Sequence, residues 1–469
     1  MRIRFSVPVW ILAACALAAS SAAAVEIVRG PYLQRTSTNS IVVRWRTDVA
    51  TDTWVGWGEL PGVYDGTVSA ASPTTEHRLT VTDLAAKTQY YYAVGTTLDI
   101  LAGGDGAHHF RTVAPAGDPG SQRIWTFGDS GETSNQPPCG EPSTGATEVL
   151  DGYLSWSGAV APDLWLILGD NAYCTGTDAE YQTALFDVYP EMLRTVGIWP
   201  VFGNHDALSS DSTTQTGAYF DMFSLPRSAE AGGVASGTEA YFSFDSGDVH
   251  IVQLDSADSG LDPGSPMLAW LASDLTANTH PWLIAAFHHP PYARGTHDSD
   301  NPSDSGGIMK KMRENVVPIL EAHGVDLVLS GHSHDYERTY LIDGHYGTTD
   351  TFDPATMLKR GGNGNPAVDG AYVKVPGPHS GTVYAVVGIG SRTEGVITPW
   401  PAMAVGLDEL GSLAIDLQGR TLDARMIRPD GSVADRFRIF HLVPLFNDGF
   451  ELGNASAWTE ISAFATSGR

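Results

Sequence analysis

The sequence predicts an α/β protein with a four-layer α/β/β/α sandwich, preceded by a separate all-β sandwich. From residue 123 onward, apolar runs typical of buried strands alternate with segments of helical periodicity, whereas before residue 114 short strands are separated by turns. Four further apolar runs indicate antiparallel hairpins that complete two packed sheets: 240–244, 249–254, 383–387 and 422–427. A chain of 469 residues, 42% of them hydrophobic, is too long for one compact core and predicts two or three domains.

The first 24 residues have the layout of a secretory signal peptide. Arg2 and Arg4 precede an apolar run from residue 5 to 17, and small residues follow it. We therefore expect a secreted protein, extracellular or periplasmic. The alternative is a lipoprotein, because residues 12–15 resemble a bacterial lipoprotein cleavage box that would leave a lipid anchor at Cys15. No later stretch reaches the roughly 18 to 20 unbroken apolar residues that a membrane span requires.

Residues 25–113 are expected to form a small β-sandwich. The runs 41–46 and 53–58 alternate apolar and polar residues, as half-buried strands do. The run 84–94 resembles the closing segment of a fibronectin type III domain, with Tyr90 at the tyrosine-corner position. Such modules usually space or dock a neighbouring domain, and no residue in this one indicates chemistry.

The remaining organisation follows from composition. Residues 114–121 contain two prolines and two glycines and predict a linker, after which a catalytic domain is expected at 122–440. Residues 339–381 are rich in Gly, Pro and Asp and predict a long loop near the active edge. Residues 441–469 predict a polar appendage without an assignable function. Helical periodicity is present at 178–195, 267–276 and 308–323.

The charge balance restricts the choice of partner. The formal net charge of −27 argues against nucleic acid and against anionic membranes, because both need a basic surface. Nucleic acid is therefore not expected as a partner, and the oligomeric state cannot be inferred from the sequence.

Five short blocks recur in order, and each follows an apolar run expected to be a buried strand: 123–127, 164–168, 198–202, 282–287 and 326–330. In open α/β sheets, the turns beyond the carboxyl ends of the strands converge on one edge, where ligands bind. We therefore expect the five blocks to form one site. They are Gly128-Asp129-Ser130-Gly131, Gly169-Asp170-Asn171-Ala172-Tyr173, Gly203-Asn204-His205-Asp206, His288-His289-Pro290 and Gly331-His332-Ser333-His334.

The residue types in these blocks are ligands for a pair of metal ions. Two ions roughly 3.5–4 Å apart need a shared ligand, and a carboxylate can bridge them. Asp170 is the expected bridge because Tyr173 supplies a further ligand one turn behind it, whereas Asp129 would serve one ion alone. The amide of Asn204 can hold a divalent ion without adding charge.

The histidines leave a choice of geometry. His332 and His334 alternate, so on extended backbone both would point to one face, whereas on a turn they would reach two adjacent ions. His288 and His289 are neighbours, and neighbouring side chains on extended backbone point in opposite directions. We expect His288 to face the ions, with Pro290 stiffening the backbone after it, and His289 to pack behind it.

Taken together, the blocks resemble the metallophosphoesterase superfamily, and specifically its purple acid phosphatases. Most of the superfamily has a histidine two residues after the first aspartate, where this chain has Gly131, and Tyr173 supplies a phenolate instead. The segment from His332 to Arg338 is close to the plant-type form, which also carries a β-sandwich before the catalytic domain. The resemblance spans about residues 26–440.

The resemblance implies that Asp129, Tyr173 and His334 bind a first ion, usually Fe(III). A hard trivalent ion also suits phenolate and carboxylate ligands. Asn204, His288 and His332 would bind a second ion, a divalent Fe, Zn or Mn, with Asp170 bridging the two. The implied reaction is hydrolysis of a phosphomonoester by a metal-bound hydroxide, as in an acid phosphatase.

Two further residues are implied in catalysis. His205 would contact the phosphoryl group, and His297 would assist substrate binding or leaving-group protonation. Asp298 stands where the plant enzymes have a second histidine, so the general acid stays open.

Two alternatives to this function remain at this point. The same metal centre would also serve a phosphodiesterase, or the chain would be a non-catalytic surface binding protein.

Cys139 and Cys174 both follow strands on the expected active edge, so we predict a disulfide between them, with two free thiols as the alternative.

Overall fold

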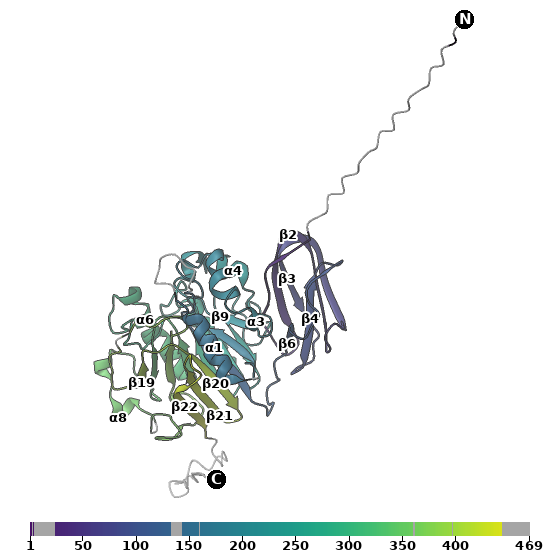
Figure 1. Cartoon of the computed structure of the whole chain (residues 1–469). Coiled ribbons are helices and arrows are strands. Elements are labelled where there is room, and N and C mark those ends of the chain that lie inside the picture. The colour runs from purple at the N-terminus through teal and green to yellow at the C-terminus, as the bar shows by residue number, and fades with distance from the viewer. Residues whose placement is uncertain are drawn as a thin grey trace.

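The computed structural model describes residues 1, 3, 24–132, 143–158, 160–359, 362–395 and 397–442. These residues form an all-β domain, on the right in Figure 1, and a larger α/β domain beside it. Nearly all of the predicted signal peptide and of the predicted appendage at 441–469 lies outside the described residues.

The amino-terminal domain consists of strands only. Its longest strand, β2, pairs with β1 through its first half, with β4 through its second half and with β3 along most of its length. The Ala85 N–H donates a hydrogen bond of 2.9 Å to the hydroxyl of Tyr90, which gives Tyr90 the geometry of a tyrosine corner. The strands are β1 Ile27–Gln34, β2 Ile41–Gly58, β3 Gly66–Val81, β4 Gln89–Gly95, β5 Ile100–Gly103 and β6 His109–Arg111.

The first sheet of the α/β domain has the order β17-β22-β21-β20-β7-β8-β9. Its parallel part, β7, β8 and β9, coincides with the first three strands predicted from the sequence. The bounds are β7 Gln122–Phe127, β8 Leu164–Ile167, β9 Ile198–Pro200, β17 Tyr372–Lys374, β20 Ser412–Gln418, β21 Thr421–Ile427 and β22 Val433–His441.

The second sheet has the order β12-β13-β14-β15-β18-β16-β19. Its strands β14 and β15 are the last two of the five strands predicted from the sequence, and they run parallel to each other. The bounds are β12 Phe242–Ser246, β13 Val249–Gln253, β14 Trp282–Ala286, β15 Leu327–Ser330, β16 Tyr336–Thr339, β18 Val383–Val387 and β19 Met403–Leu407. A short hairpin, β10 Ser210–Asp211 with β11 Thr216–Gly217, stands apart from both sheets.

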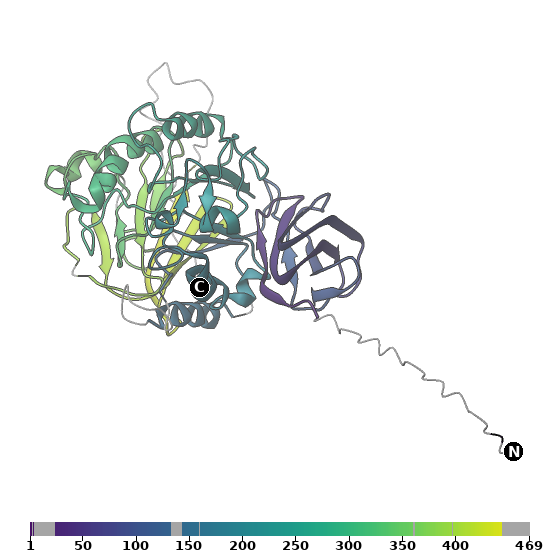
Figure 2. The same ribbon diagram turned by 90° about the horizontal axis from the view of Figure 1, so that it is seen from above.

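The two sheets pack face to face around one apolar core. Trp199 of the first sheet stacks on Phe244 of the second, with ring centroids 3.7 Å apart. Helix α1 (Gly145–Ser157) covers the outer face of the first sheet and stacks Tyr153 on Trp125, and α5 (Pro266–Ala277) packs on the outer face of the second sheet. Figure 2 shows helices on both sides of the strands. The four-layer α/β/β/α prediction is therefore confirmed.

Two of the predicted helices are interrupted. The segment predicted as one helix at 178–195 is α2 (Asp178–Tyr181), a π-helical turn (Gln182–Phe186) and α3 (Pro190–Leu193). The segment at 308–323 is α6 (Ile308–Lys311), a π-helical turn (Met312–Val316) and α7 (Val317–Ala322). Pro190 and Pro318 lie in the first turns of α3 and α7, because proline lacks the N–H that a helix interior needs.

The remaining elements are short. Residues 339–381 are mostly irregular, but they include α8 and the strand β17, which the sequence did not predict. The short elements are α4 Ala218–Met222, α8 Pro354–Met357 and single turns at Asp206–Leu208, Asp304–Gly307 and Thr349–Thr351.

The two domains share an extensive polar interface. Strand β1 bridges to β9 in parallel at Gln34 and Ile198. The buried guanidinium of Arg29 donates two hydrogen bonds, of 2.9 and 3.1 Å, to the carboxylate of Asp178. Arg46 donates two more to the same carboxylate, at 2.8 and 2.6 Å. The β-domain is thus fastened to the first residue of α2, shortly after the second block.

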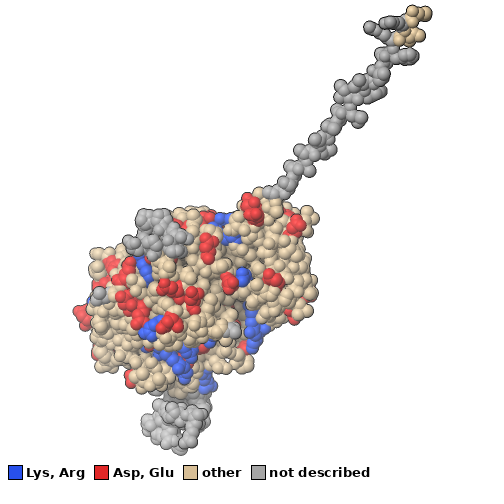
Figure 3. Space-filling view, viewed as in Figure 1, with Lys and Arg blue, Asp and Glu red and all other residues tan. Residues whose placement is uncertain are grey.

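Charged side chains are unevenly distributed on the face shown in Figure 3. Acidic side chains are scattered over this face, and Lys and Arg gather near its lower edge, where Figure 1 labels β21 and β22. Arg425, Arg436 and Arg438 of these strands all pair with Asp423. Their charge is therefore partly neutralised within the fold. Among the described residues, no helix is both long and apolar enough to cross a membrane.

A buried histidine makes the stability of the β-domain depend on pH. His77 is fully buried, accepts or donates hydrogen bonds with Thr47 (2.8 Å) and Thr53 (2.9 Å), and stacks on Trp45. Burial lowers its pKa from 6.5 to about 4. Between these two values the unfolded chain binds a proton that the folded domain does not, so the free energy of unfolding falls as the pH is lowered from 6.5 through 4.

We therefore expect wild type to lose stability between pH 6.5 and pH 4 more steeply than His77→Gln, by at most about 1.4 kcal/mol per pH unit. Urea unfolding followed by fluorescence at several pH values measures both slopes. Equal slopes would show that His77 does not contribute.

Candidate metal centre

The five blocks meet where the two sheets meet. Asp129, Asp170 and Asn204 follow β7, β8 and β9, whereas His288 and His332 follow β14 and β15. The prediction of a single sheet edge was therefore incomplete, because three blocks come from one sheet and two from the other. Face-to-face packing brings the carboxyl ends of both sets of parallel strands together.

Three of the predicted ligands form a first group. The Tyr173 hydroxyl lies 3.1 Å from Oδ1 of Asp129 and 3.2 Å from Nε2 of His334. Nε2 of His334 lies 3.4 Å from Oδ1 of Asp129. Metal–ligand bonds of about 2.0–2.2 Å place adjacent ligands of one ion about 3 Å apart, so these three atoms are spaced as ligands of a common ion.

A second group lies on the other side of Asp170. Nε2 of His288 is 2.9 Å from Oδ1 of Asn204. The ligand atoms of Asp170, His288 and His332 all lie within 4.8 Å of one another. This group combines two imidazoles with a neutral amide and so carries less negative charge than the first.

Asp170 joins the two groups through one oxygen. Its Oδ2 lies 3.2 Å from the Tyr173 hydroxyl and 3.2 Å from Nε2 of His288. A carboxylate in contact with both groups is what a bridging ligand requires. The donor set therefore fits two cations, the first with harder oxygen ligands and the second with more nitrogen ligands.

The backbone carries strain at three of these positions. Asp129, Asp170 and His332 have positive φ angles of 58°, 52° and 70°. Non-glycine residues adopt this left-handed conformation rarely and at a cost, and they do so mainly at functional sites. The turn at His332 decides the choice that the sequence left open, because His332 joins the second group and His334 the first.

Two glycines allow the blocks to approach one another. A Cβ at Gly203 would lie 2.1 Å from the backbone nitrogen of Asp170, and one at Gly331 would lie 2.4 Å from Oδ2 of Asp129. A Cβ at Gly131 would lie 2.8 Å from the ring of Tyr173. The phenol therefore occupies the space that a side chain at position 131 would need.

The electrostatics of the buried cluster demand positive charge. Burial, together with Asp170 and Asp129, raises the pKa of Tyr173 well above 10. Burial would lower the pKa of His288, but Asp170 outweighs it and raises this pKa to about 9. In both cases the nearby carboxylates favour the protonated form of the side chain. Bound cations would displace these protons, because metal binding requires deprotonated ligands.

His332 is in a different electrostatic position. Burial and the neighbouring imidazoles lower its pKa well below 6.5. Its ring is therefore neutral at ordinary pH, which is the form that ligates a metal.

The two predicted catalytic histidines lie at the rim of the cluster. Nδ1 of His205 donates to the Cys174 carbonyl at 2.7 Å, and its Nε2 is 3.9 Å from Oδ2 of Asp170. His297 stacks on His332 with ring centroids 3.9 Å apart, and its Nδ1 lies 2.8 Å from Oδ1 of Asp304. Both rings therefore face the cluster edge with one nitrogen fixed by the protein.

His289 lies beside the cluster. Its Nδ1 pairs with the Ser256 hydroxyl at 2.9 Å, and its ring packs on His332. Cys174 is disulfide-bonded. The predicted partner, Cys139, lies outside the described residues, so the pairing stays a prediction.

Sequence reasoning missed several residues that support the cluster. The buried carboxylate of Asp206 accepts hydrogen bonds from Gly203, Asn171 and Tyr181 and so ties two blocks together. Nε of Arg392 lies 2.8 Å from Nδ1 of His334. Asp206 stands inside a quoted block, so its position was a usable signal, whereas no motif points to Arg392.

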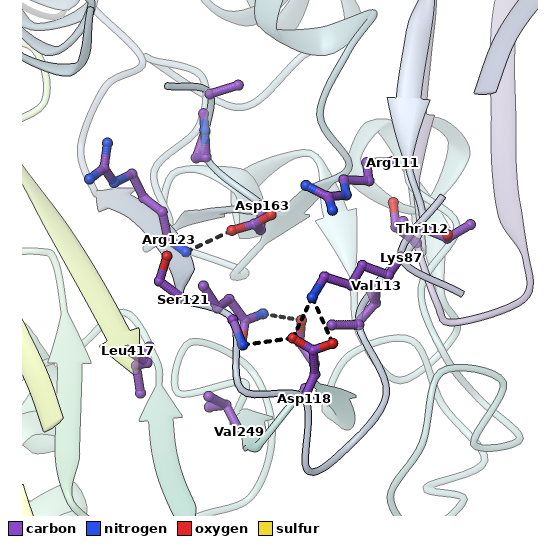
Figure 4. A pocket seen from close by; sticks show the side chains of 18 of the residues that line it. Lys87, Arg111, Thr112, Val113, Asp118, Ser121, Arg123, Asp163, Val249 and Leu417 are labelled. Carbon is purple, nitrogen blue, oxygen red and sulfur yellow. Dashed lines mark hydrogen bonds and ion pairs between the residues drawn. The ribbon is translucent and has the colours of Figure 1, made fainter. Parts of the chain in front are cut away.

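A cavity of about 550 Å³ lies on the opposite edge of the molecule (Figure 4). It is lined by the starts of strands, including Arg123 and Val249, and by Asp163 before β8. Lys87 of the β-domain pairs there with Asp118 at 2.6 Å. Because the metal ligands lie at the other ends of the strands, this cavity is separate from the candidate centre.

Comparison with known proteins agrees with this geometry. Residues 122–336 match the family model of calcineurin-like phosphoesterases, and residues 29–112 match the model of the purple acid phosphatase amino-terminal domain. The chain therefore carries a calcineurin-like phosphoesterase domain and a purple acid phosphatase amino-terminal domain. The family resemblance drawn from the sequence is confirmed.

Individual relatives are distant. Purple acid phosphatase 15 of Arabidopsis thaliana is 28% identical over 60% of this chain, and the match spans only 52% of the relative's length. Purple acid phosphatase 18 of the same plant is 29% identical over 68% of each chain. The uncharacterized protein Rv2577 of Mycobacterium tuberculosis is 26% identical over 81% of this chain and 73% of its own length.

Solved structures support the fold. The purple acid phosphatase PPD1 from yellow lupin seeds superposes with a TM-score of 0.66 at 18% identity, covering 88% of this chain and 75% of the lupin chain. A structure of PhoD gives a TM-score of 0.59 at 11% identity, covering 86% and 87%. At such identities the likeness concerns the fold alone.

The neighbouring histidines provide a matched test of the ligand set. We expect His288→Ala to lose one of the two bound ions, because it removes a nitrogen from the second group, whereas His289→Ala keeps both. Metal content per chain, measured by inductively coupled plasma mass spectrometry after gel filtration, distinguishes the two variants. Equal metal content in both would contradict the assignment of His288.

Proposed function

We propose that this protein is an exported phosphatase that hydrolyses phosphomonoesters at a centre of two metal ions. The observation that carries the proposal is the position of Asp170, whose Oδ2 contacts both Tyr173 and His288 at 3.2 Å. The first ion, Fe(III), would be held by Asp129, Tyr173 and His334. The second, a divalent Fe, Zn or Mn, would be held by Asn204, His288 and His332.

Bound at this centre, the two ions would generate a nucleophile from water and neutralise phosphoryl oxygens. The protein's own residues orient the substrate. The carbonyl of Cys174 can only accept, so the Nδ1 of His205 carries a proton and Nε2 faces the cluster. This orientation supports the proposal that His205 contacts a phosphoryl oxygen. His297, whose Nδ1 pairs with Asp304, stacks on His332, and we propose that it assists substrate binding or leaving-group protonation.

Export is supported by two features. Residues 1–24 have the pattern of a signal peptide, and Cys174 takes part in a disulfide, a bond that persists mainly in oxidising compartments. A lipid anchor at Cys15 is the alternative form of export.

A small phosphomonoester is favoured over the other readings. Tyr173 and Gly131 together are the purple acid phosphatase combination, which argues against a phosphodiesterase. A non-catalytic binding protein would not need seven donors in two adjoining groups, with three of them in strained backbone.

Asn204 tests catalysis directly. Asn204→Ala is expected to lower kcat for 4-nitrophenyl phosphate by about 100-fold or more, the size expected when one preorganised polar group is removed. Circular dichroism should be unchanged. The control is Asn278→Ala, remote from the centre, where the side chain bonds only the backbone of His280 among the residues that the structure describes.

Activity of Asn204→Ala equal to wild type would contradict the catalytic assignment. Faster turnover of bis(4-nitrophenyl) phosphate than of the monoester would instead favour the phosphodiesterase.

Colour tests the first ion. Tyrosinate bound to Fe(III) absorbs visible light, so wild type is expected to be purple and Tyr173→Phe to lose this band. Tyr241→Phe, which alters a partly buried tyrosine packed on Trp270, is expected to keep it. A colourless but active wild type would show that the first ion is not ferric.

A further inference from the structure

The loop between the second block and α2 is organised by one carboxylate. Oε1 of Glu180 accepts a hydrogen bond of 2.7 Å from the Cys174 N–H. Its Oε2 accepts from the N–H groups of Thr175 (3.1 Å) and Thr177 (2.8 Å) and from both threonine hydroxyls (3.2 and 2.9 Å). Burial would raise the pKa of Glu180, but these donors outweigh it and lower the pKa, so the carboxylate is charged.

The start of the helix that carries Glu180 is fixed by two sets of contacts. Thr177 and Glu180 form a capping box, in which each side chain bonds the other's backbone N–H. Asp178, the first residue of α2, is held by Arg29 and Arg46 of the β-domain. Glu180 therefore presents its oxygens to the loop from a position set by both domains.

The same loop orients a predicted catalytic side chain. The N–H of Cys174 donates to Glu180, and the carbonyl of the same residue accepts the Nδ1 proton of His205 at 2.7 Å. The His205 ring also packs on Tyr173, with centroids 4.3 Å apart. Gly176 is packed so closely on the third block that a Cβ there would lie 2.8 Å from the His205 carbonyl. A displaced Cys174 would therefore release the imidazole.

We propose that Glu180 is a positioning residue that acts through the Cys174 carbonyl to aim His205 at the phosphoryl group. This inference rests on the proposed phosphatase function. It assigns to Glu180 a role in binding the phosphoryl oxygens and no role in holding the metal ions, because Glu180 contacts none of the seven predicted ligands through the hydrogen bonds described.

The test is a double-mutant cycle between Glu180→Gln and His205→Ala. Glutamine replaces one acceptor oxygen by an NH₂ donor, which must face either the Cys174 N–H or those of Thr175 and Thr177. We expect Glu180→Gln to lower kcat/KM for 4-nitrophenyl phosphate about 10-fold, equivalent to about 1.4 kcal/mol. In the His205→Ala background the same change should lower it less than about 2-fold, because the residue it positions is gone.

The control is Glu191→Gln, which alters an exposed first-turn glutamate of α3 that pairs only with Arg194 among the described residues and should leave kcat/KM unchanged. Metal content should equal that of wild type in every variant. If Glu180→Gln does not fold, Glu180→Asp enters the same cycle, because the shorter chain cannot reach both Cys174 and Thr177.

Equal losses in both backgrounds, or loss of metal in Glu180→Gln, would overturn the proposal. Calorimetric binding of inorganic phosphate to the metal-loaded protein separates this failure from that of the proposed function. If wild type neither hydrolyses the ester nor binds phosphate, the proposed function fails and this proposal fails with it. If wild type binds phosphate and hydrolyses the ester but the double-mutant cycle is additive, the proposed function stands and only the role of Glu180 is rejected.

Discussion

The structure depends on the concentration of negative charge between two sheets. Asp129 and Asp170 are buried, and both contact the hydroxyl of Tyr173 within 3.2 Å. Buried carboxylates this close to one another are unfavourable unless positive charge lies between them. His288, whose pKa is raised to about 9 by Asp170, supplies part of it as a proton, and bound cations would supply more. The packing of strands, glycines and strained turns is arranged around this need.

The strained turns follow from the same requirement. At the end of a parallel strand, the backbone normally continues in the direction of the strand or turns away from the neighbouring strands. The positive φ angles of Asp129, Asp170 and His332 turn these residues inward instead, toward a point shared by both sheets. The hydrogen bond of 2.8 Å from the His332 N–H to Oδ2 of Asp129 joins the first block to the last across the two sheets. The cost in backbone energy is thus offset within the cluster itself.

Much of this could be predicted from the sequence because it is local. Apolar runs located all five strands, and residue type pointed to the side chains after them that the structure brings together. The division of these strands between two sheets could not be predicted, because strand pairing is set by long-range contacts such as Trp199 on Phe244. The divergence of His332 and His334 depended on a single φ angle, which alternating residues do not encode.

Support residues were the hardest to predict. Glu180 is an ordinary first-turn glutamate in the sequence, and only the folded loop shows that it receives N–H groups from Cys174, Thr175 and Thr177. Its capping box with Thr177 was readable, since the pattern predicts a helix start. The consequence for His205 was not readable, because it passes through a carbonyl of a loop that has no motif of its own.

From its sequence, the β-domain was expected only to space or dock a neighbouring domain. The structure gives it a further role. Arg29 and Arg46 both pair with Asp178. The hydroxyl of Tyr32 and the side-chain amide of Gln34, both in β1, donate hydrogen bonds to the carbonyl of Met222 in the α/β domain. Asp178 begins the helix that carries Glu180, so the β-domain sets the position of the helix that shapes the second active-site loop. The β-domain thus contributes to the position of this loop through the ion pairs of Arg29 and Arg46 with Asp178.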